Sequence, residues 1–232
     1  VQLNSSCPLI KKNNKFRKIL KPKVSIKFNP SKNKDLSKNE NILDVNNIFN
    51  LDRISSGNTL ESGLSMTYGL DYILADENGD DEIFSIKLAN NLRLKENNDL
   101  EKNHQLGDRT SNFFGELSFS PLNFINSKYK ISTLNNLSDI NYQNLITEIK
   151  YNNFVTTLDY LRQDGDKNSY ILNKTTYNFN ESNGITFSTR ENLKSDLTEY
   201  YNLIYQYKND CLVAGLEYQK EYYKDSEIDP TE

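Results

Sequence analysis

Several residue types are scarce in this chain of 232 residues, and each scarcity argues against a class of protein. The only histidine, His104, stands in a polar stretch where we expect an exposed loop, so a Ser-His-Asp catalytic set would rest on one surface side chain. The two cysteines, Cys7 and Cys211, are too few for a disulfide scaffold and lack the spacing of metal ligands. The sequence therefore predicts no enzyme and no metal or other cofactor.

Long apolar runs and a one-sided charge balance are missing as well. No apolar stretch approaches the roughly 18 residues that a membrane-spanning helix needs. The net charge is -4, with Lys and Arg mixed among Asp and Glu, so the chain lacks the basic surface that nucleic-acid binding requires. The N-terminus shows neither a Met nor a signal-peptide pattern, and the C-terminus ends on a polar stretch. We expect a fragment of a longer protein.

The chain is rich in aromatic residues, with fifteen Tyr and eleven Phe, which argues against disorder despite a mean hydropathy of -0.75. Residues 59–74, TLESGLSMTYGLDYIL, alternate between apolar and polar side chains almost without interruption. Such alternation predicts a β-strand with one apolar face. Ordinary strands run about five or six residues, so this one is unusually long.

About eleven alternating segments follow one another, joined by turn-forming stretches such as NGD, QDGDKN and ESNG. They cover residues 20–28, 59–74, 84–94, 113–119, 129–131, 145–151, 154–160, 171–179, 185–193, 201–207 and 212–218. Residues 29–41 read as a polar loop, and no segment shows helical spacing. Long antiparallel strands match the thickness of a hydrocarbon layer, where a sheet must close on itself. The sequence therefore predicts an all-β fold, a partial antiparallel transmembrane β-barrel, over residues 1–232.

In such a barrel, alternate residues face lipid and a water-filled lumen. The lipid-facing candidates are Leu64, Met66, Tyr68, Leu70 and Tyr72. The lumen-facing candidates are Glu61, Asp71, Glu148, Lys150, Arg190 and Glu217. The tyrosines expected at the membrane interface are Tyr68, Tyr72, Tyr205, Tyr207 and Tyr218. A soluble β-sandwich also alternates, with its polar rows in water, and this alternative stays open on periodicity alone.

Two charged stretches each allow two interpretations. The basic residues Lys11, Lys12, Lys15, Arg17, Lys18, Lys21 and Lys23 fit either contact with lipid phosphates or simple solvation. The acidic run DENGDDE at 76–82 fits a hairpin tip better than a calcium loop, because it lacks a Glu at the twelfth position.

Three stretches, in order along the chain, resemble the LptD family of lipopolysaccharide-assembly proteins. The first is CPLIKKNNKFRKILKPKVSIKFNP, the second NNIFNLDRISSGNTLESGLSMTYGL, and the third YQYKNDCLVAGLEYQKEYYKDSEIDP. The matching positions are Pro8, Leu9, Leu20, Pro22, Pro30, Asn47, Ile48, Phe49, Arg53, Glu61, Gly63, Tyr68, Gly69 and Cys211. The departures are Ser56, Asn58 and Thr59, where the family usually has Gly, Asp and Arg, Lys21, where an acidic residue is common, and Cys7, at an aromatic position.

The resemblance implies a translocon in the outer membrane of Gram-negative bacteria, and not an enzyme. Such a protein receives lipopolysaccharide from a periplasmic bridge protein, passes the sugar part through its lumen and releases the lipid sideways among the membrane lipids. An LptE-like lipoprotein would plug the lumen. The chain would be a middle-to-late part of the barrel, without the N-terminal periplasmic domain and the closing strand. A general porin or receptor barrel and a surface β-protein such as an adhesin remain alternatives.

The resemblance also gives Cys211 a role. In the family, the cysteine at this position forms a disulfide with the N-terminal periplasmic domain, so we expect such a bond in the complete protein. Cys7 lies on a strand far from Cys211 in sequence, and two cysteines bond only if their Cα atoms come within about 7 Å. We expect no bond between Cys7 and Cys211.

Overall fold

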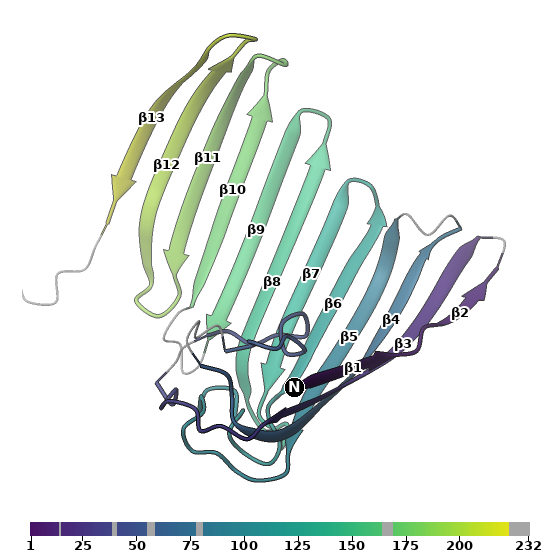
Figure 1. The fold of residues 1–232 in the computed structure, drawn as a ribbon. Coiled ribbons are helices and arrows are strands. Elements are labelled where there is room, and N and C mark those ends of the chain that lie inside the picture. Colours follow the sequence, from purple (N-terminus) through teal and green to yellow (C-terminus); the bar gives the residue numbers. More distant parts are fainter. Residues whose placement is uncertain (14, 39–40, 55–58, 78–80, 164–168, 223–232) are drawn as a thin grey trace, which may run out of the picture. The chain divides into compact units, whose positions relative to one another are not determined.

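The protein is an antiparallel meander of thirteen strands in the computed structural model, which describes residues 1–13, 15–38, 41–54, 59–77, 81–163 and 169–222. The strands are β1 (Gln2–Ser6), β2 (Leu9–Lys12), β3 (Phe16–Asn29), β4 (Gly63–Asp76), β5 (Glu82–Arg93), β6 (Phe113–Leu122), β7 (Ile125–Thr133), β8 (Ile140–Tyr151), β9 (Phe154–Gln163), β10 (Tyr170–Asn178), β11 (Asn183–Asn192), β12 (Leu197–Lys208) and β13 (Val213–Glu221) (Figure 1). These described parts contain no helix, and so none that is long and apolar enough to cross a membrane. The all-β antiparallel prediction is confirmed.

The eleven segments that alternation predicts are β3 to β13, and the structure adds β1 and β2 before them. Both of these short strands pair with the same edge of β3, β1 with Lys23–Lys27 and β2 with Arg17–Leu20. Together they act as one edge strand that is interrupted at Cys7 and Pro8. The sequence missed them because four or five residues are too few for a clear period of two.

The chain divides into two compact units, which are described separately. The first unit comprises Val1–Pro121 and Lys128–Gln143, and the second comprises Leu122–Ser127 and Asn144–Glu232.

In the first unit, the polar face of the sheet is buried and the apolar face is exposed. Strands β3 and β4 pair without a break over fourteen residues each, from Phe16 opposite Asp76 to Asn29 opposite Gly63. On β4, Leu64, Met66, Tyr68 and Leu70 are exposed, whereas the alternating Ser65 and Thr67 are only 2% and 0% exposed. A sheet in water has the opposite arrangement. The exposed apolar row therefore argues against a soluble β-sandwich.

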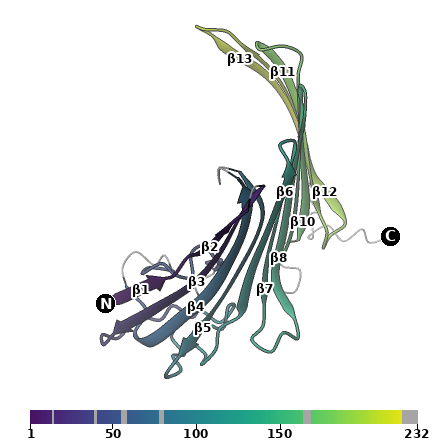
Figure 2. The same ribbon diagram turned by 90° about the vertical axis from the view of Figure 1, so that its right-hand side faces the viewer.

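Two long connections of the first unit, 30–62 and 94–112, bury this polar face. We call their described residues, 30–38, 41–54, 59–62 and 94–112, the inner segments, and Figure 2 shows the strands β3, β4, β5 and β6 that these connections join. They form a small hydrophobic core with the sheet, made of Leu43, Val45, Ile48, Ile54, Leu100 and Leu106 from the segments, Ala89 from β5 and Phe114 from β6. We expected a polar loop at 29–41 and assigned no role to the apolar residues after it. The structure shows that these residues fold back onto the sheet.

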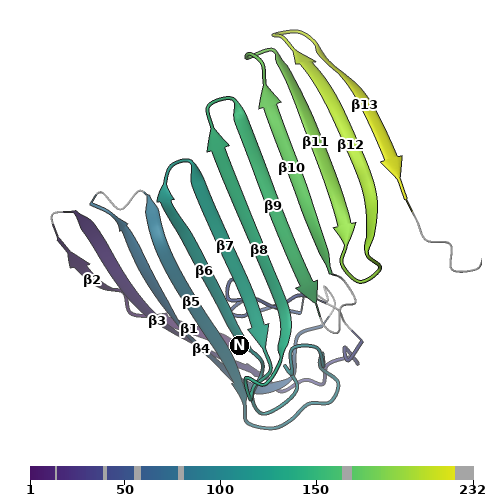
Figure 3. The same cartoon turned by 180° about the vertical axis from the view of Figure 1, so that it is seen from behind.

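In the second unit, strands β9 to β13 form successive hairpins (Figure 3). One face carries polar residues, with a hydroxyl hydrogen bond of 2.9 Å between Thr176 and Thr186. The other face carries apolar and aromatic residues in register, such as Ile185 opposite both Tyr177 and Tyr205. No residue of β13 is buried on either face.

The meander places successive connections alternately at two opposite ends of the strands. One end carries 13–15, 77–81, 123–124, 152–153, 179–182 and 209–212, and we call it the short-connection end. The other carries both inner segments, together with 134–139, 164–169 and 193–196. In outer-membrane barrels, short turns face the periplasm and longer loops face outward. Cys211 lies at the short-connection end.

Candidate functional site

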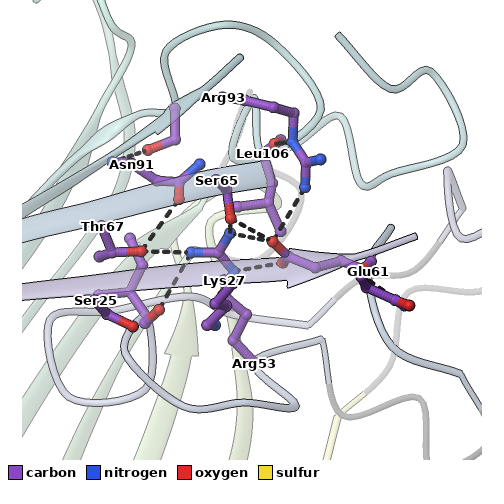
Figure 4. A network of polar contacts seen from close by, with 12 residues as sticks. Ser25, Lys27, Arg53, Glu61, Ser65, Thr67, Asn91, Arg93 and Leu106 are labelled. Atoms are coloured by element: carbon purple, nitrogen blue, oxygen red, sulfur yellow. Dashed lines mark hydrogen bonds and ion pairs between the residues drawn. The ribbon is translucent and has the colours of Figure 1, made fainter. Parts of the chain in front are cut away.

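A buried polar network fastens the first inner segment to the wall of the sheet, and its centre is an ion pair between Arg53 and Glu61 (Figure 4). The Arg53 guanidinium donates from Nε to Glu61 Oε2 and from Nη2 to Glu61 Oε1, each at 2.6 Å. The two side chains are 0% and 5% exposed. Two parallel hydrogen bonds of this kind give the strongest geometry for a guanidinium and a carboxylate.

Residues of β4 and β5 complete the network from the sheet side. Thr67 Oγ1 accepts a hydrogen bond of 2.9 Å from Arg53 Nη1, and Ser65 Oγ donates one of 2.9 Å to Glu61 Oε1. Arg93, which lies opposite Ser65 in the register, donates to the same carboxylate oxygen at 3.1 Å. The small polar side chains of the inward row thus act as hydrogen-bond partners for the segment.

The network places two guanidinium groups and the amino group of a lysine around one carboxylate. Besides Arg53 and Arg93, Lys27 lies on the inward row of β3, and its ammonium group donates to the carbonyl oxygen of Asn50. Burial alone would raise the pKa of Glu61, but the charge and hydrogen bonds of Arg53, with the charges of Lys27 and Arg93, lower it to about 2. Glu61 is therefore a carboxylate at any physiological pH.

An aromatic contact continues the attachment along β4. The ring of Phe49 lies over Gly69, where an added Cβ would come within 2.8 Å of Phe49 Cζ and 2.6 Å of the Leu88 carbonyl oxygen. Gly69 thus leaves room for the ring against the sheet. The Lys23 ammonium lies 4.6 Å from the centre of the same ring, a favourable contact between a cation and an aromatic face.

Two further polar contacts join the segment to β6 and β7. Asn46 Nδ2 donates to Glu116 Oε2 at 2.8 Å, and Lys130 Nζ donates to Asp44 Oδ2 at 2.7 Å. Burial would raise the pKa of Asp44, yet the hydrogen bond and charge of Lys130 and the amides of Asn46 and Asn47 lower it. With the contact from Lys27 of β3, the segment is therefore held at five neighbouring strands, β3 to β7.

His104 is buried, so the prediction of an exposed loop was wrong. It is 3% exposed and lies in the second inner segment, where its Nε2 is 3.1 Å from the Leu43 amide nitrogen and 3.7 Å from Glu101 Oε1. Glu101 is 1% exposed, and its oxygens accept no hydrogen bond among the described residues. Burial raises the pKa of Glu101 to about 8. The folded protein therefore keeps this carboxyl largely protonated at neutral pH.

The predicted lumen-facing residues fall in both units. In the first unit, Glu61 belongs to the central network, and Asp71 Oδ1 lies 2.8 Å from Lys23 Nζ. Both carboxylates are buried in contacts with cations, so they do not form a hydrated wall.

In the second unit, the predicted residues make partly exposed contacts. Glu148 and Lys150 pair at 2.8 Å, and Arg190 pairs with Glu199 at 2.8 Å. Glu217 Oε1 accepts a hydrogen bond from Asn202 at 2.7 Å.

The other predicted residues lie apart from the network. Leu64, Met66, Tyr68, Leu70 and Tyr72 all lie on β4, and the first four of them are exposed. Cys7 and Cys211 are exposed free thiols. The tip of the acidic hairpin, 78–80, lies outside the described residues, as do Ser56 and Asn58. No cluster of three His, Cys, Asp or Glu side chains that suits a metal ion occurs in the described part.

The sequence did not single out Lys27 and Arg93 as site residues, and it gave Arg53 only through the family resemblance. Lys27, Arg53 and Arg93 are far apart along the chain, and they meet only because β3, β4 and β5 are adjacent. The one local signal was the pattern that contains Arg53 and Glu61, which the resemblance included without assigning a contact between them.

The family model described as LptD: LPS transport system D matches residues 1–193. The chain belongs to the LptD family. None of the curated proteins compared with the chain matches it. LptD proteins act in lipopolysaccharide transport and outer-membrane assembly in Gram-negative bacteria, and they are transport proteins rather than enzymes. Both recognition of the family from sequence and this general role are therefore confirmed.

The network explains several of the positions that mark the LptD resemblance. Ile48 is fully buried in the core, Phe49 covers Gly69, and Arg53 pairs with Glu61. Gly63 has a φ of +89°, which residues other than glycine rarely adopt. A Cβ added at this position would lie 3.1 Å from Arg93 Nη1. The motif thus encodes the docking of an inner segment onto the wall.

Replacing Arg53 by Ala should loosen the first inner segment. Glu61 would lose its bidentate partner while it stays buried, which costs on the order of 3 kcal/mol. Hydrogen–deuterium exchange of residues 41–54 in the lipid-reconstituted protein should accelerate strongly at neutral pH. The effect should fade as the pH falls from about 4.5 toward 2, because protonation of Glu61 then removes the stabilisation in the wild type as well.

Arg109→Ala is the matched control for Arg53→Ala. Arg109 forms an ion pair with Glu96 at 3.5 Å in which both side chains are mostly exposed, and such pairs contribute little. Equal protection of residues 41–54 in Arg53→Ala and Arg109→Ala would refute the structural role of the Arg53–Glu61 pair.

At pH 8 the second inner segment should be more stable in the Glu101→Gln variant than in the wild type. The pKa of Glu101 is about 8 when folded and near 4.5 when unfolded, so between these values the folded state binds more protons and its stability falls as the pH rises. Glutamine cannot ionise and removes this dependence. The measurement is hydrogen-exchange protection of residues 94–112 at pH 6 and pH 8, corrected for the intrinsic exchange rate at each pH. An unchanged pH dependence in Glu101→Gln, or the same change in the exposed Glu96→Gln, contradicts this assignment.

Proposed function

We propose that the chain is part of the wall of an outer-membrane translocon that delivers lipopolysaccharide to the outer leaflet. The carrying observation is the inverted sheet of the first unit, in which an apolar row is exposed and a polar row is covered by polar contacts. This arrangement suits a wall with lipid on one side and a hydrated, protein-lined lumen on the other. In this proposal Leu64, Met66, Tyr68, Leu70 and Tyr72 face lipid.

The lumen carries the polar sugar part of the glycolipid. Lipopolysaccharide arrives from a periplasmic bridge protein at the short-connection end, and its lipid part leaves sideways into the membrane. The polar face of the second unit, with Arg190, Thr186 and Thr176, offers hydroxyl and guanidinium groups to sugar and phosphate oxygens. The inner segments occupy part of the lumen, and an LptE-like lipoprotein fills part of the remaining space.

Adjacent residues of β11 give a sharp test of the two faces. Thr186 lies on the polar face and Phe187 on the apolar face, one residue apart. A photo-cross-linking amino acid at 186 should capture lipopolysaccharide in transporting cells, whereas the same group at 187 should capture membrane acyl chains. Absence of a lipopolysaccharide adduct at 186 while transport continues would reject the lumen assignment. Adducts with soluble periplasmic proteins at 187 would reject the lipid face.

We also propose that Cys211 bonds to the N-terminal periplasmic domain of the complete protein. Cys211 is exposed in the connection 209–212, where its amide donates to Asn209 Oδ1 at 3.0 Å. This connection lies at the short-connection end, which is the periplasmic end in outer-membrane barrels. The periplasm is oxidising, so a disulfide can persist there.

Non-reducing mass mapping of the full-length protein from outer membranes should find Cys211 linked to an N-terminal cysteine. Cys7 should carry no link to Cys211. A free Cys211 thiol, or a Cys7–Cys211 peptide, would remove this proposed role.

A further inference from the structure

We infer that the inward face of β2 and β3 forms a binding subsite for phosphate groups of an anionic glycolipid. We call it the cation ladder, and it consists of Lys12, Arg17, Lys21 and Lys23. The inference rests on the proposed function for the identity of the glycolipid, and on the structure for the anion chemistry.

The register places these cations on one face. Lys12 lies directly opposite Arg17, and Arg17, Lys21 and Lys23 share the inward row of β3 with the buried Ser25 and Lys27. Four residues of strand separate Arg17 from Lys21 by about 13 Å. The ladder therefore begins at the short-connection end and runs toward the inner segment.

One carboxylate stands against the inner end of the ladder. Asp71 lies directly opposite Lys21 in the register, and its Oδ1 lies 2.8 Å from Lys23 Nζ, with which it pairs. Lys12, Arg17 and Lys21 form no ion pair among the described residues. On the row of Arg17 the nearest carboxylate is that of Glu82, which stands two strands away across Ala75, at about 10 Å.

The contact between Lys12 and Arg17 has a cost in the protein alone. Like charges directly opposite each other in a sheet are destabilising. Arg17 Nε is moreover a buried donor that finds no hydrogen-bond partner within the described part of the chain. An anion between these side chains would offset the repulsion and accept this hydrogen bond.

A cavity marks the inner end of the ladder. It has a volume of about 210 Å³ and is lined by Asn4, Ser5, Ser6, Lys21, Lys23, Val24 and Phe49. Two ammonium groups, an amide and hydroxyl groups suit a phosphate, because all of them can donate to its oxygens. Phe49, which belongs to the first inner segment, lines the cavity, so a glycolipid bound there would contact that segment.

The opposite face of the same hairpin supplies a matched control. Lys11 lies opposite Lys18 in the register, one residue away from the Lys12–Arg17 pair and on the other face of the sheet. The double variants Arg17→Gln/Lys21→Gln and Lys11→Gln/Lys18→Gln therefore remove the same number of positive charges from the β2–β3 hairpin, the first pair from its inward face and the second from its outward face. Lys21 forms no ion pair in the described part, so Lys21→Gln alone serves if the first double variant fails to fold.

The full-length protein, in detergent with its lumenal partner, is titrated with lipopolysaccharide and with phosphatase-treated lipopolysaccharide. Arg17→Gln/Lys21→Gln should bind untreated lipopolysaccharide about tenfold more weakly than the wild type, as expected for lost charge-assisted hydrogen bonds. It should bind the dephosphorylated form as the wild type does. Lys11→Gln/Lys18→Gln should match the wild type with both, and Arg17→Lys/Lys21→Arg should restore binding.

Four outcomes would overturn the inference. The first is an unchanged affinity for lipopolysaccharide in Arg17→Gln/Lys21→Gln, and the second is an equal loss of affinity for the untreated and the dephosphorylated forms. The third is the same loss of affinity in Lys11→Gln/Lys18→Gln. The fourth is displacement of lipopolysaccharide by low millimolar inorganic phosphate, which would assign the subsite to the free ion. A wild-type protein that fails to bind lipopolysaccharide would reject the proposed function itself, which is a different result from a wild type that binds equally well without the ladder.

Discussion

The structure of the first unit depends on how a charged pair can be taken out of water. Arg53 and Glu61 are both buried, and such a pair is tolerable only when every donor and acceptor finds a partner. Thr67, Ser65 and Arg93 supply those partners from the wall. The inward row of the sheet is polar because its side chains complete this network. The same hydrogen bonds keep the first inner segment on the sheet.

This constraint links the two faces of the sheet. The inner segments cover the polar face of the sheet, so they cannot also cover its apolar face. The exposed apolar side chains of Leu64, Met66 and Leu70 are the observation on which the proposed contact with membrane lipid rests. In the second unit the same alternation recurs with a more open polar face, where the Arg190–Glu199 contact is partly exposed and the Asn202–Glu217 contact is exposed. In such a sheet, hydrogen bonds stabilise the polar face, and removal of apolar side chains from water stabilises the other face.

The strands could be predicted from the sequence because a period of two is a local property, and β3 to β13 all carry it. The inner segments could not, because their apolar residues show no period and gain their meaning only from contact with Ala89 and Phe114. His104 illustrates the limit: its neighbours in sequence are polar, yet Leu43 and Phe114 bury it. Likewise, Lys27 and Arg93 join Arg53 through strand adjacency, which no spacing along the chain reveals.

The position of the first inner segment also bears on the order in which the sheet assembles. Strands β4 and β5 are joined by the short connection 77–81, whereas β3 and β4 are separated by 30–62. Closing the longer connection costs more chain entropy, and no β3–β4 hydrogen bond can form until that cost is met. Docking of the segment on β4 through Arg53 and Phe49 brings its two ends together and shortens the search. The β4–β5 hairpin would then act as the template, and β3 would join after the segment has found its place.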